Sequence, residues 1–428
     1  MELRVAAASR IIDPIVPCEM GSGPKDVRTT RTQGHLEANG VLFRCEGTSI
    51  LVISIDALYV GAELRSRLEL SLEGRLDPSQ IFVAASHTHN APMLDTHHRR
   101  LGGVVEQQLS YVCDQLSDLA TGLTEVPGSS AKVETSTFRS QSVTRRRRKR
   151  LVSGRERMLQ FRAVANAPSK REVSVVGRFV LVSEGKYPIA VIWQLPCHPT
   201  SYPHDDEHSA HFPGWIPSRL RERFGDIPVL FLQGFSADLR PPAVRTPRGP
   251  REWLRRALLG PWFSEFSEKD YAAWCSTILE DLDRGISRRR ESASTRLECR
   301  RVEVPLNQLT VHANEAPSTA SSHYLRIGEF KVLGISAEVP YELDMAHRGI
   351  TSVSCIDDVF GYAPTDTMRE EGGYESEGFL KYFDIAELGP GFGHAFASLL
   401  EAPLQDTGGD CRQGNRSGAA ELSSKSSG

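Results

Sequence analysis

Histidines follow two of the most apolar segments of this sequence, at the point where each segment ends. His87 and His89 come after Ile81–Ala85, and His198 comes after Ala190–Leu195. In an extended chain, side chains two positions apart share a face and lie about 7 Å apart, so His87 and His89 can approach the same ion or substrate. Imidazole binds transition metals and exchanges protons near neutral pH. These positions indicate a metal or catalytic site, with structural histidines as the alternative.

Polar residues follow two further apolar segments in the same way. Ser236 and Asp238 come shortly after Pro228–Leu232, where they either join a site or cap a turn. Glu338 follows the segment that begins at Phe330, and it lies at the predicted start of a helix. A glutamate at that position often only complements the helix dipole, so the pattern leaves both interpretations open.

Three other groups of residues have the right chemistry but no decisive spacing. Tyr362 and Tyr374 lie in loops rich in glycine and proline, where tyrosines commonly serve in packing. The basic run 145–150 is predicted to be a solvated loop or strand edge, with one arginine, Arg145, as a candidate to face inward. A polar loop adds three histidines that are either ligands or exposed side chains: His204, His208 and His211.

The segments that must position these side chains alternate between strand-like and helix-like patterns. This alternation predicts an α/β fold, in which ligands collect beyond the carboxyl ends of strands. The predicted strands are 49–55, 81–85, 173–182, 190–195 and 228–232, and the predicted helices are 61–76, 103–123, 213–224 and 265–282.

Composition sets the class of protein. The chain has 428 residues, of which 39% are hydrophobic and 25% charged, so it can bury a large core. Lys and Arg number 51 and Asp and Glu 54, and 51 − 54 = −3 leaves no cationic field that would favour nucleic acid. We find no apolar run of the roughly 20 residues that a membrane helix needs, and no signal-peptide core. With eight scattered cysteines, we expect a cytoplasmic protein with reduced thiols.

Two segments depart from the regular α/β pattern. Residues 241–288 include an irregular stretch rich in Pro, Arg and Trp that is either a lid or an insertion. From residue 405 onward the sequence turns to small polar residues, which bury too little apolar surface to offset the entropy of ordering. We therefore predict one domain over 1–404 and a disordered tail over 405–428.

Taken in chain order, these blocks resemble the catalytic region of the neutral (non-lysosomal) ceramidase family, zinc amidases that cleave N-acyl sphingosines. The resemblance covers about residues 3–400. The family's H-T-H-S-G-P-G motif is similar to the segment from His87 to Pro92, and its later blocks are similar to Cys197–Thr200, Ala337–Pro340, Gly361-Tyr362 and Tyr374-Glu375.

The resemblance implies a fold, a metal and a role for each matched residue. The fold would be a mixed β-sheet core flanked by helices, here without the family's C-terminal immunoglobulin-like domain. The ion would be Zn²⁺, activating a water for hydrolysis of an N-acyl amide in a lipid or small molecule. The implied zinc ligands are His87, His198, Glu338 and Tyr362, and the implied catalytic residues are His89, Tyr374, Ser236 and Arg145.

The sequence also departs from the family pattern. Asn90 replaces a serine, and the bulky residues 91–94 replace a small Gly-Pro-Gly-Gly turn beside the second histidine. The substrate is therefore ceramide-like or another N-acyl compound. Two further functions stay open: a metal-dependent acyltransferase or cyclase in small-molecule biosynthesis, and an inactive binding protein of the same fold.

Overall fold

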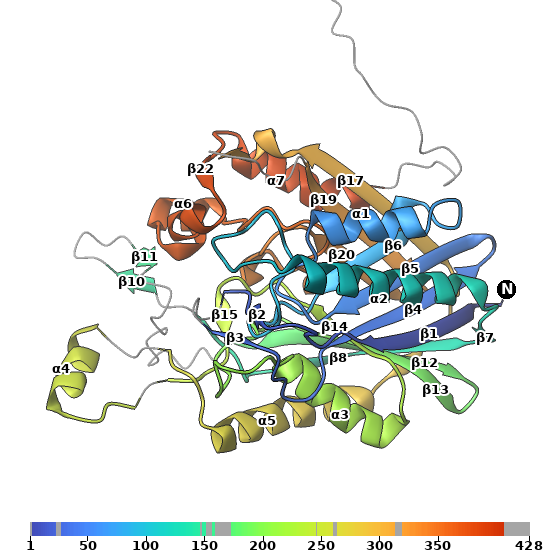
Figure 1. The fold of residues 1–428 in the computed structure, drawn as a ribbon, viewed down its shortest axis with the longest axis horizontal. Helices are drawn as coiled ribbons and strands as arrows, with labels where there is room; N and C mark the ends of the chain where they lie inside the picture. Colours follow the sequence, from blue (N-terminus) through green and yellow to red (C-terminus); the bar gives the residue numbers. More distant parts are fainter. Residues whose placement is uncertain are drawn as a thin grey trace, which may run out of the picture.

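The computed structural model describes residues 2–22, 27–145, 148–150, 156–158, 173–244, 246–259, 263–312 and 319–405. Within these ranges, three sheets of four or five strands lie at the centre, and helices flank them (Figure 1).

The first sheet has five strands in the order β6-β5-β4-β1-β7. Neighbouring strands are antiparallel except β5 and β6, which are parallel and joined through helix α1 (Ala62–Ser71). β6 is buried along its whole length, as its run of apolar residues requires. The strands are β1 (Arg4–Ile11), β4 (Glu37–Cys45), β5 (Thr48–Ile55), β6 (Ile81–Ala85) and β7 (Ser129–Ser130).

The second sheet repeats this topology in the order β14-β13-β12-β8-β16. Again the strands are antiparallel except for one pair, β13 and β14, which helix α3 (Phe212–Phe224) connects. The strands are β8 (Lys132–Ser140), β12 (Val175–Glu184), β13 (Tyr187–Leu195), β14 (Val229–Gln233) and β16 (Arg290–Glu291).

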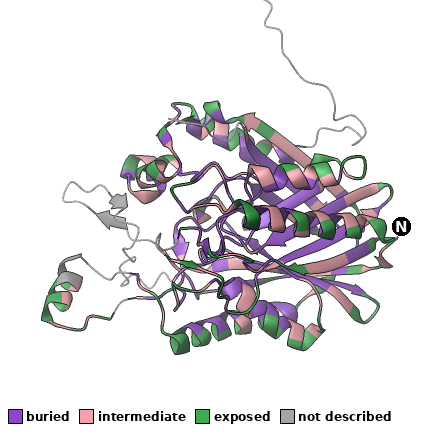
Figure 2. Cartoon of the chain, in the orientation of Figure 1, coloured by how far each residue is buried: buried purple, intermediate pink, exposed green. Residues whose placement is uncertain are grey.

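These two sheets pack face to face and form the middle of a four-layer sandwich. Val52 of the first sheet and Ile192 of the second belong to one buried cluster between them. Helices α1 and α2 (Glu106–Glu125) cover the outer face of the first sheet, and α3 and α5 (Glu268–Ile286) cover that of the second (Figure 1). Buried residues accordingly fill the sheets, while exposed ones lie on the outer sides of the helices (Figure 2).

The third sheet has the order β17-β19-β20-β21 and joins the first near β6. Val332 of β20 shares a buried cluster with Phe82 of β6, and the amide of Ala85 donates to the carbonyl of Cys355 at 3.0 Å. Helix α7 (Phe392–Glu401) packs against this sheet. Its strands are β17 (Leu297–Pro305), β19 (Thr319–Ile327), β20 (Phe330–Ile335) and β21 (Thr351–Val353).

Short elements complete the described chain. Helix α4 (Pro250–Leu259) projects from the body of the protein (Figure 1), whereas α5 is part of the buried core. The segment 241–288 is therefore not a single movable unit. The remaining elements are β2 (Cys18–Glu19), β3 (Arg28–Thr29), β9 (Thr144–Arg145), β10 (Arg148–Arg150), β11 (Glu156–Met158), β15 (Leu239–Arg240), β18 (Thr310–His312), β22 (Ile385–Leu388) and α6 (Asp366–Glu371).

The predicted α/β class is confirmed, with a mixed-sheet core flanked by helices. Each strand and helix that was predicted by its residue range is present, with its ends shifted by a few residues. One local prediction is wrong: Glu338 does not begin a helix, because it pairs with Tyr362 in an isolated bridge and precedes Pro340 and a short 3₁₀ turn, Tyr341–Leu343. Residues 406–428 of the predicted tail lie outside the described residues, so the domain boundary stays a prediction.

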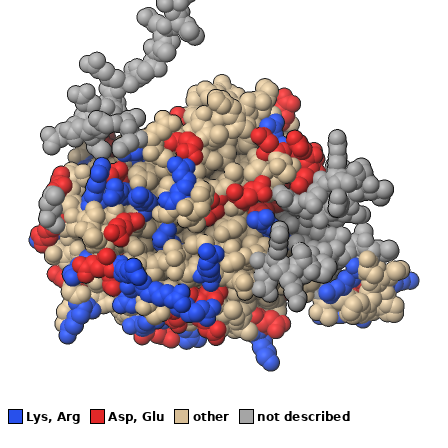
Figure 3. Space-filling view, turned by 180° about the vertical axis from the view of Figure 1, so that it is seen from behind, with Lys and Arg blue, Asp and Glu red and all other residues tan. Residues whose placement is uncertain are grey.

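The surface agrees with the near balance of charges in the sequence. Basic and acidic side chains are interspersed on the face that Figure 3 displays. Among the described residues, no helix combines the length and apolarity needed to cross a membrane.

Candidate metal centre

Three imidazoles converge at the strand ends. The Nε2 atom of His198 lies 3.1 Å from Nε2 of His87 and 3.1 Å from Nε2 of His89. We call these three residues the histidine centre, and one ring nitrogen from each could ligate a common metal ion. Four-coordinate zinc with nitrogen ligands at about 2.0–2.1 Å holds neighbouring ligand atoms roughly 3.3 Å apart, so the observed spacing fits such an ion.

The backbone orients His87 and His198 toward each other. His87 comes just after β6 with φ at 62°, a left-handed conformation that turns the chain sharply out of the strand. Its Nδ1 lies 3.1 Å from the carbonyl of Leu58, which leaves Nε2 to face the centre. His198 comes just after β13, and its amide donates to the carbonyl of Leu239 at 3.3 Å.

Glu338 brings a carboxylate from the third sheet to the same place. Its Oε2 lies 3.5 Å from Nε2 of His87, and this buried oxygen has no hydrogen-bond partner among the described residues. The other oxygen, Oε1, accepts a hydrogen bond of 2.5 Å from the hydroxyl of Tyr59. A buried carboxylate oxygen that lies beside imidazole nitrogens and accepts no hydrogen bond is well placed to bind a metal ion.

Electrostatics favour the charged form of this carboxylate. Burial alone would raise the pKa of Glu338, but the nearby imidazole of His87 and the hydroxyls of Tyr362 and Tyr59 outweigh burial and lower it. Burial, together with the nearby Glu338 charge, raises the pKa of Tyr59 well above 10, so its hydroxyl stays a proton donor. Glu338 is therefore an anion held in place, with a free oxygen toward His87.

The two predicted tyrosines lie next to each other on the Glu338 side. Tyr362 is 3% exposed and bonds to the Glu338 side chain, and the Tyr362 and Tyr374 rings meet edge to face at 5.4 Å. Tyr374 begins a short π-helical turn, Tyr374–Gly378, and is only partly buried. Tyr362 is thus in contact with the carboxylate of Glu338.

Ser236 and Arg145 lie on the His198 side. Ser236 accepts a hydrogen bond from Gln233, which also donates to the carbonyl of Cys197 at 3.0 Å. Arg145 pairs with Leu239 across β9 and β15, and its Nε lies 3.2 Å from the buried carboxylate of Asp238. This arginine therefore turns toward the protein interior, as the sequence suggested one member of the basic run would.

Asn90 and two histidines of the polar loop surround the turn that carries His89. Asn90 follows His89, and its Oδ1 lies 2.7 Å from Nε2 of His211. His208 places Nδ1 3.1 Å from the carbonyl of Asn90. His208 and His211 are both buried, so of the two alternatives the exposed one is wrong for these histidines; they pack against the turn that carries His89.

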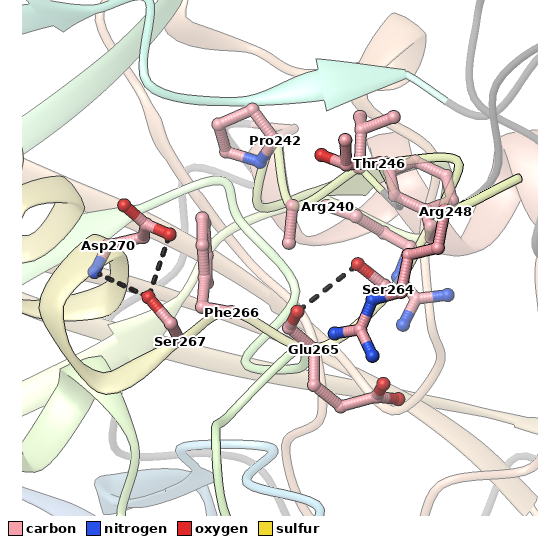
Figure 4. Close-up of a pocket in the computed structure, with 12 residues that line it drawn as sticks. Arg240, Pro242, Thr246, Arg248, Ser264, Glu265, Phe266, Ser267 and Asp270 are labelled. Atoms are coloured by element: carbon pink, nitrogen blue, oxygen red, sulfur yellow. Dashed lines mark hydrogen bonds between the residues drawn. The ribbon is translucent and has the colours of Figure 1, made fainter.

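A cavity of about 730 Å³ lies beside the His198 loop, between residues 240–248 and 263–270 (Figure 4). Arg240 lies at its wall, and its guanidinium donates to Thr200 at 3.1 Å. The amide of Phe266, also in the wall, donates to the carbonyl of Ser201. The described residues before α5 thus form a polar chamber whose wall contacts the loop that follows His198.

The structure is a helix–sheet–sheet–helix sandwich in which imidazoles and a carboxylate lie together near the ends of strands. This is a ceramidase-like fold. The neutral ceramidase from Pseudomonas aeruginosa superposes with a TM-score of 0.70 and 12% identity over 93% of this chain and 73% of that one. A structure described as ceramidase complexed with C2 gives 0.71 and 12% over 93% and 74%. No protein-family model and no curated protein sequence matches the chain.

Proposed function

We propose that this protein is a zinc-dependent hydrolase that cleaves an N-acyl amide bond. The observation that carries the proposal is the approach of two imidazoles, with Nε2 of His87 3.1 Å from Nε2 of His198, to a buried carboxylate oxygen that has no donor. The third imidazole, His89, lies 3.1 Å from His198, within reach of a substrate bound there. The ceramidase names of the two structural neighbours support the same class of substrate.

His87, His198, Glu338 and Tyr362 would hold the zinc ion. Two imidazoles, a carboxylate and a phenolic oxygen form a donor set that zinc accepts. When bound, the ion supplies Lewis-acid chemistry, lowering the pKa of water and polarising a carbonyl. The carbonyl of Leu58 and the hydroxyl of Tyr59 fix the orientation of this donor set.

The remaining residues would act on the substrate. His89 is partly exposed, so its imidazole can accept a proton and return it to the leaving amine. The Tyr374 hydroxyl would donate a hydrogen bond to the amide oxygen as negative charge develops there. Ser236 and Arg145, on the His198 side, would bind polar groups of the substrate. A seryl nucleophile is unnecessary when water is the attacking group.

The substrate class is an N-acyl amine, with ceramide as one member. Ala91, Met93 and Leu94 are all buried beside the turn of the second histidine, so this wall is filled by protein. The 730 Å³ chamber, whose wall contacts the loop after His198, is lined by arginine, serine and carboxylate residues as well as Phe263 and Phe266. We therefore include soluble N-acyl compounds with a polar group among the substrates.

The test is turnover of a panel of N-acyl amines by the purified protein, with metal content measured on the same sample. A hydrolase releases free acid and free amine without a second amine, whereas an acyltransferase requires one. Glu338→Gln and His87→Ala should lose both zinc and turnover, and His89→Ala should lose turnover while keeping zinc. Full zinc content in the first two variants would overturn the ligand assignment, and a panel without any turnover would favour a binding protein.

A further inference from the structure

A second group of metal-binding side chains lies near the histidine centre. Asp95, His97 and Asp358, which we call the aspartate cluster, each offer a ligand atom, and these atoms lie within 4.8 Å of one another. Nδ1 of His97 is 3.1 Å from Oδ2 of Asp358. Asp358 lies 261 positions further along the chain than His97, so this is a tertiary contact between two loops.

The strongest evidence that the aspartate cluster binds a cation is the burial of the Asp95 carboxylate without a hydrogen-bond donor for one of its oxygens. Its side chain is 0% exposed, and its Oδ2 has no hydrogen-bond partner among the described residues. The nearest cation candidate, Nε2 of His98, is 3.6 Å away and lies 2.6 Å from the carbonyl of Val359 instead. A buried carboxylate oxygen without a donor costs free energy, and a second carboxylate close by adds repulsion. One cation between the two carboxylates removes both costs.

Backbone packing around Asp95 is unusually close. A Cβ atom at Gly61 would lie 3.1 Å from Cα of Asp95, and Gly61 has φ at 79°, so only glycine fits there without strain. The Gly61 amide also donates to the carbonyl of Asp357, the residue before Asp358. The two loops are therefore pressed together by backbone contacts that keep the carboxylates near each other.

We propose that the aspartate cluster is a second binding site, for a divalent first-row transition ion of the Zn²⁺ or Mn²⁺ type. Two carboxylates with one imidazole suit these ions, whereas Ca²⁺ takes six to eight oxygen ligands. The side chains of His97 and Asp358 are 27% and 18% exposed, so an ion can enter from solvent and these two can turn inward to bind it.

An ion at this site fixes the loops that carry the histidine centre. Residues 86–98 hold His87 and His89 as well as Asp95, and residues 355–362 hold Tyr362 as well as Asp358. Tyr59 lies between the two sites, with its ring 5.3 Å from that of His87 and 5.9 Å from that of His98. The second ion is therefore structural: it holds the metal ligands of the first site in register.

The test counts bound metal in the full chain after equilibration with Zn²⁺ and, separately, Mn²⁺, followed by gel filtration and elemental analysis. The wild type should hold about two ions per chain, and Asp358→Asn and His198→Ala about one each. Asp358→Asn is nearly isosteric at a partly exposed position, and His97→Gln is a second variant with the same expectation. The matched control is Glu268→Gln, which breaks an exposed carboxylate–imidazole pair, 3.1 Å between Glu268 and His204, outside both sites.

Each outcome decides between the two sites. Unchanged metal content in both Asp358→Asn and His97→Gln, with melting curves that show folded protein, would overturn the second site. A count that falls in these variants but not in His198→Ala would support the second site and contradict the proposed function. In His198→Ala, added Mn²⁺ should raise the melting temperature by a few degrees, and Asp358→Asn should abolish that rise.

Discussion

The histidine centre and the aspartate cluster use the same stretch of chain, residues 86–98, but they are built differently. His87 and His89 come just after β6 and His198 just after β13, so the ends of two regular strands bring the turns that carry these side chains to one point. The aspartate cluster comes from irregular loops, where close backbone contacts take the place of strands. The difference indicates that strand ends position the histidines of the first site, while the second site depends on the two loops staying together.

The largest expected effect is at the histidine centre. His198→Ala removes the nitrogen that lies 3.1 Å from both other imidazoles, so the site loses its central ligand. We expect amidase kcat/KM to fall by at least the ~10²–10³-fold that loss of one transition-state contact costs, with parallel loss of zinc. Steady-state kinetics and elemental analysis measure both quantities.

His347→Ala serves as the control for that substitution, because His347 is exposed on a short turn away from both sites. Equal losses in His198→Ala and His347→Ala would mean that the imidazoles of the centre have no special role.

Acid should destabilise the protein because the imidazoles of His208 and His211, which contact Asn90, are buried. Burial lowers the pKa of His211 to about 3 and also lowers that of His208. The unfolded chain therefore binds more protons below pH 6.5, so stability is full above that pH and falls as the pH drops from 6.5 toward 3. From pH 6.5 to pH 5, His211 alone should cost about 2 kcal/mol of unfolding free energy.

Urea unfolding at a series of pH values measures this slope. His211→Gln keeps a donor for the Asn90 amide oxygen but cannot titrate, so its stability should depend less on pH than that of the wild type. An identical slope in the two proteins would rule out His211 as the source.

Support of the carboxylate is the next test of the histidine centre. Tyr59→Phe removes the hydroxyl that donates to Oε1 of Glu338 at 2.5 Å and leaves the ring in place. Groups that orient a metal ligand typically contribute 10–100-fold to metal affinity or activity, and we expect a loss of that size in zinc affinity. Tyr324→Phe, at a buried tyrosine on β19, is the control and should bind zinc as the wild type does. A Tyr59→Phe protein with wild-type affinity would show that Glu338 needs no such support.

The sequence predicted the parts of this molecule that regular strands determine. Apolar runs located β6, β13 and β14, and reading the polar residue after each run led to His87, His198 and Ser236, which the structure places at neighbouring strand ends. This worked because a strand fixes both the position of its end and the direction of the chain there. Their roles at the site stay predictions.

What the sequence could not predict depends on contacts between distant, irregular segments. Tyr59 reaches Glu338 across 279 positions, and no local pattern distinguishes it from any other core tyrosine. His208 and His211 lie in a polar loop that is typical of exposed residues, yet Asn90 and its neighbours bury them. The expected helix at Glu338 failed for a related reason, because pairing with Tyr362 replaced the local preference.

The smallest expected effect separates the two sites most sharply. The aspartate cluster affects the reaction only indirectly, by fixing the loops that carry the ligands of the histidine centre. Asp358→Asn should therefore lower kcat/KM by less than about 10-fold, the low end of what supporting groups around a metal contribute. If the aspartate cluster of the Asp358→Asn variant still binds metal weakly, high Zn²⁺ or Mn²⁺ concentrations should restore part of the lost kcat/KM. Activity is therefore measured across a metal titration. A loss as large as that of His198→Ala would mean that Asp358 acts on the substrate directly. In that case the two clusters would form one extended active site, and the distinction between a histidine centre built at strand ends and a supporting aspartate cluster built from loops would be wrong.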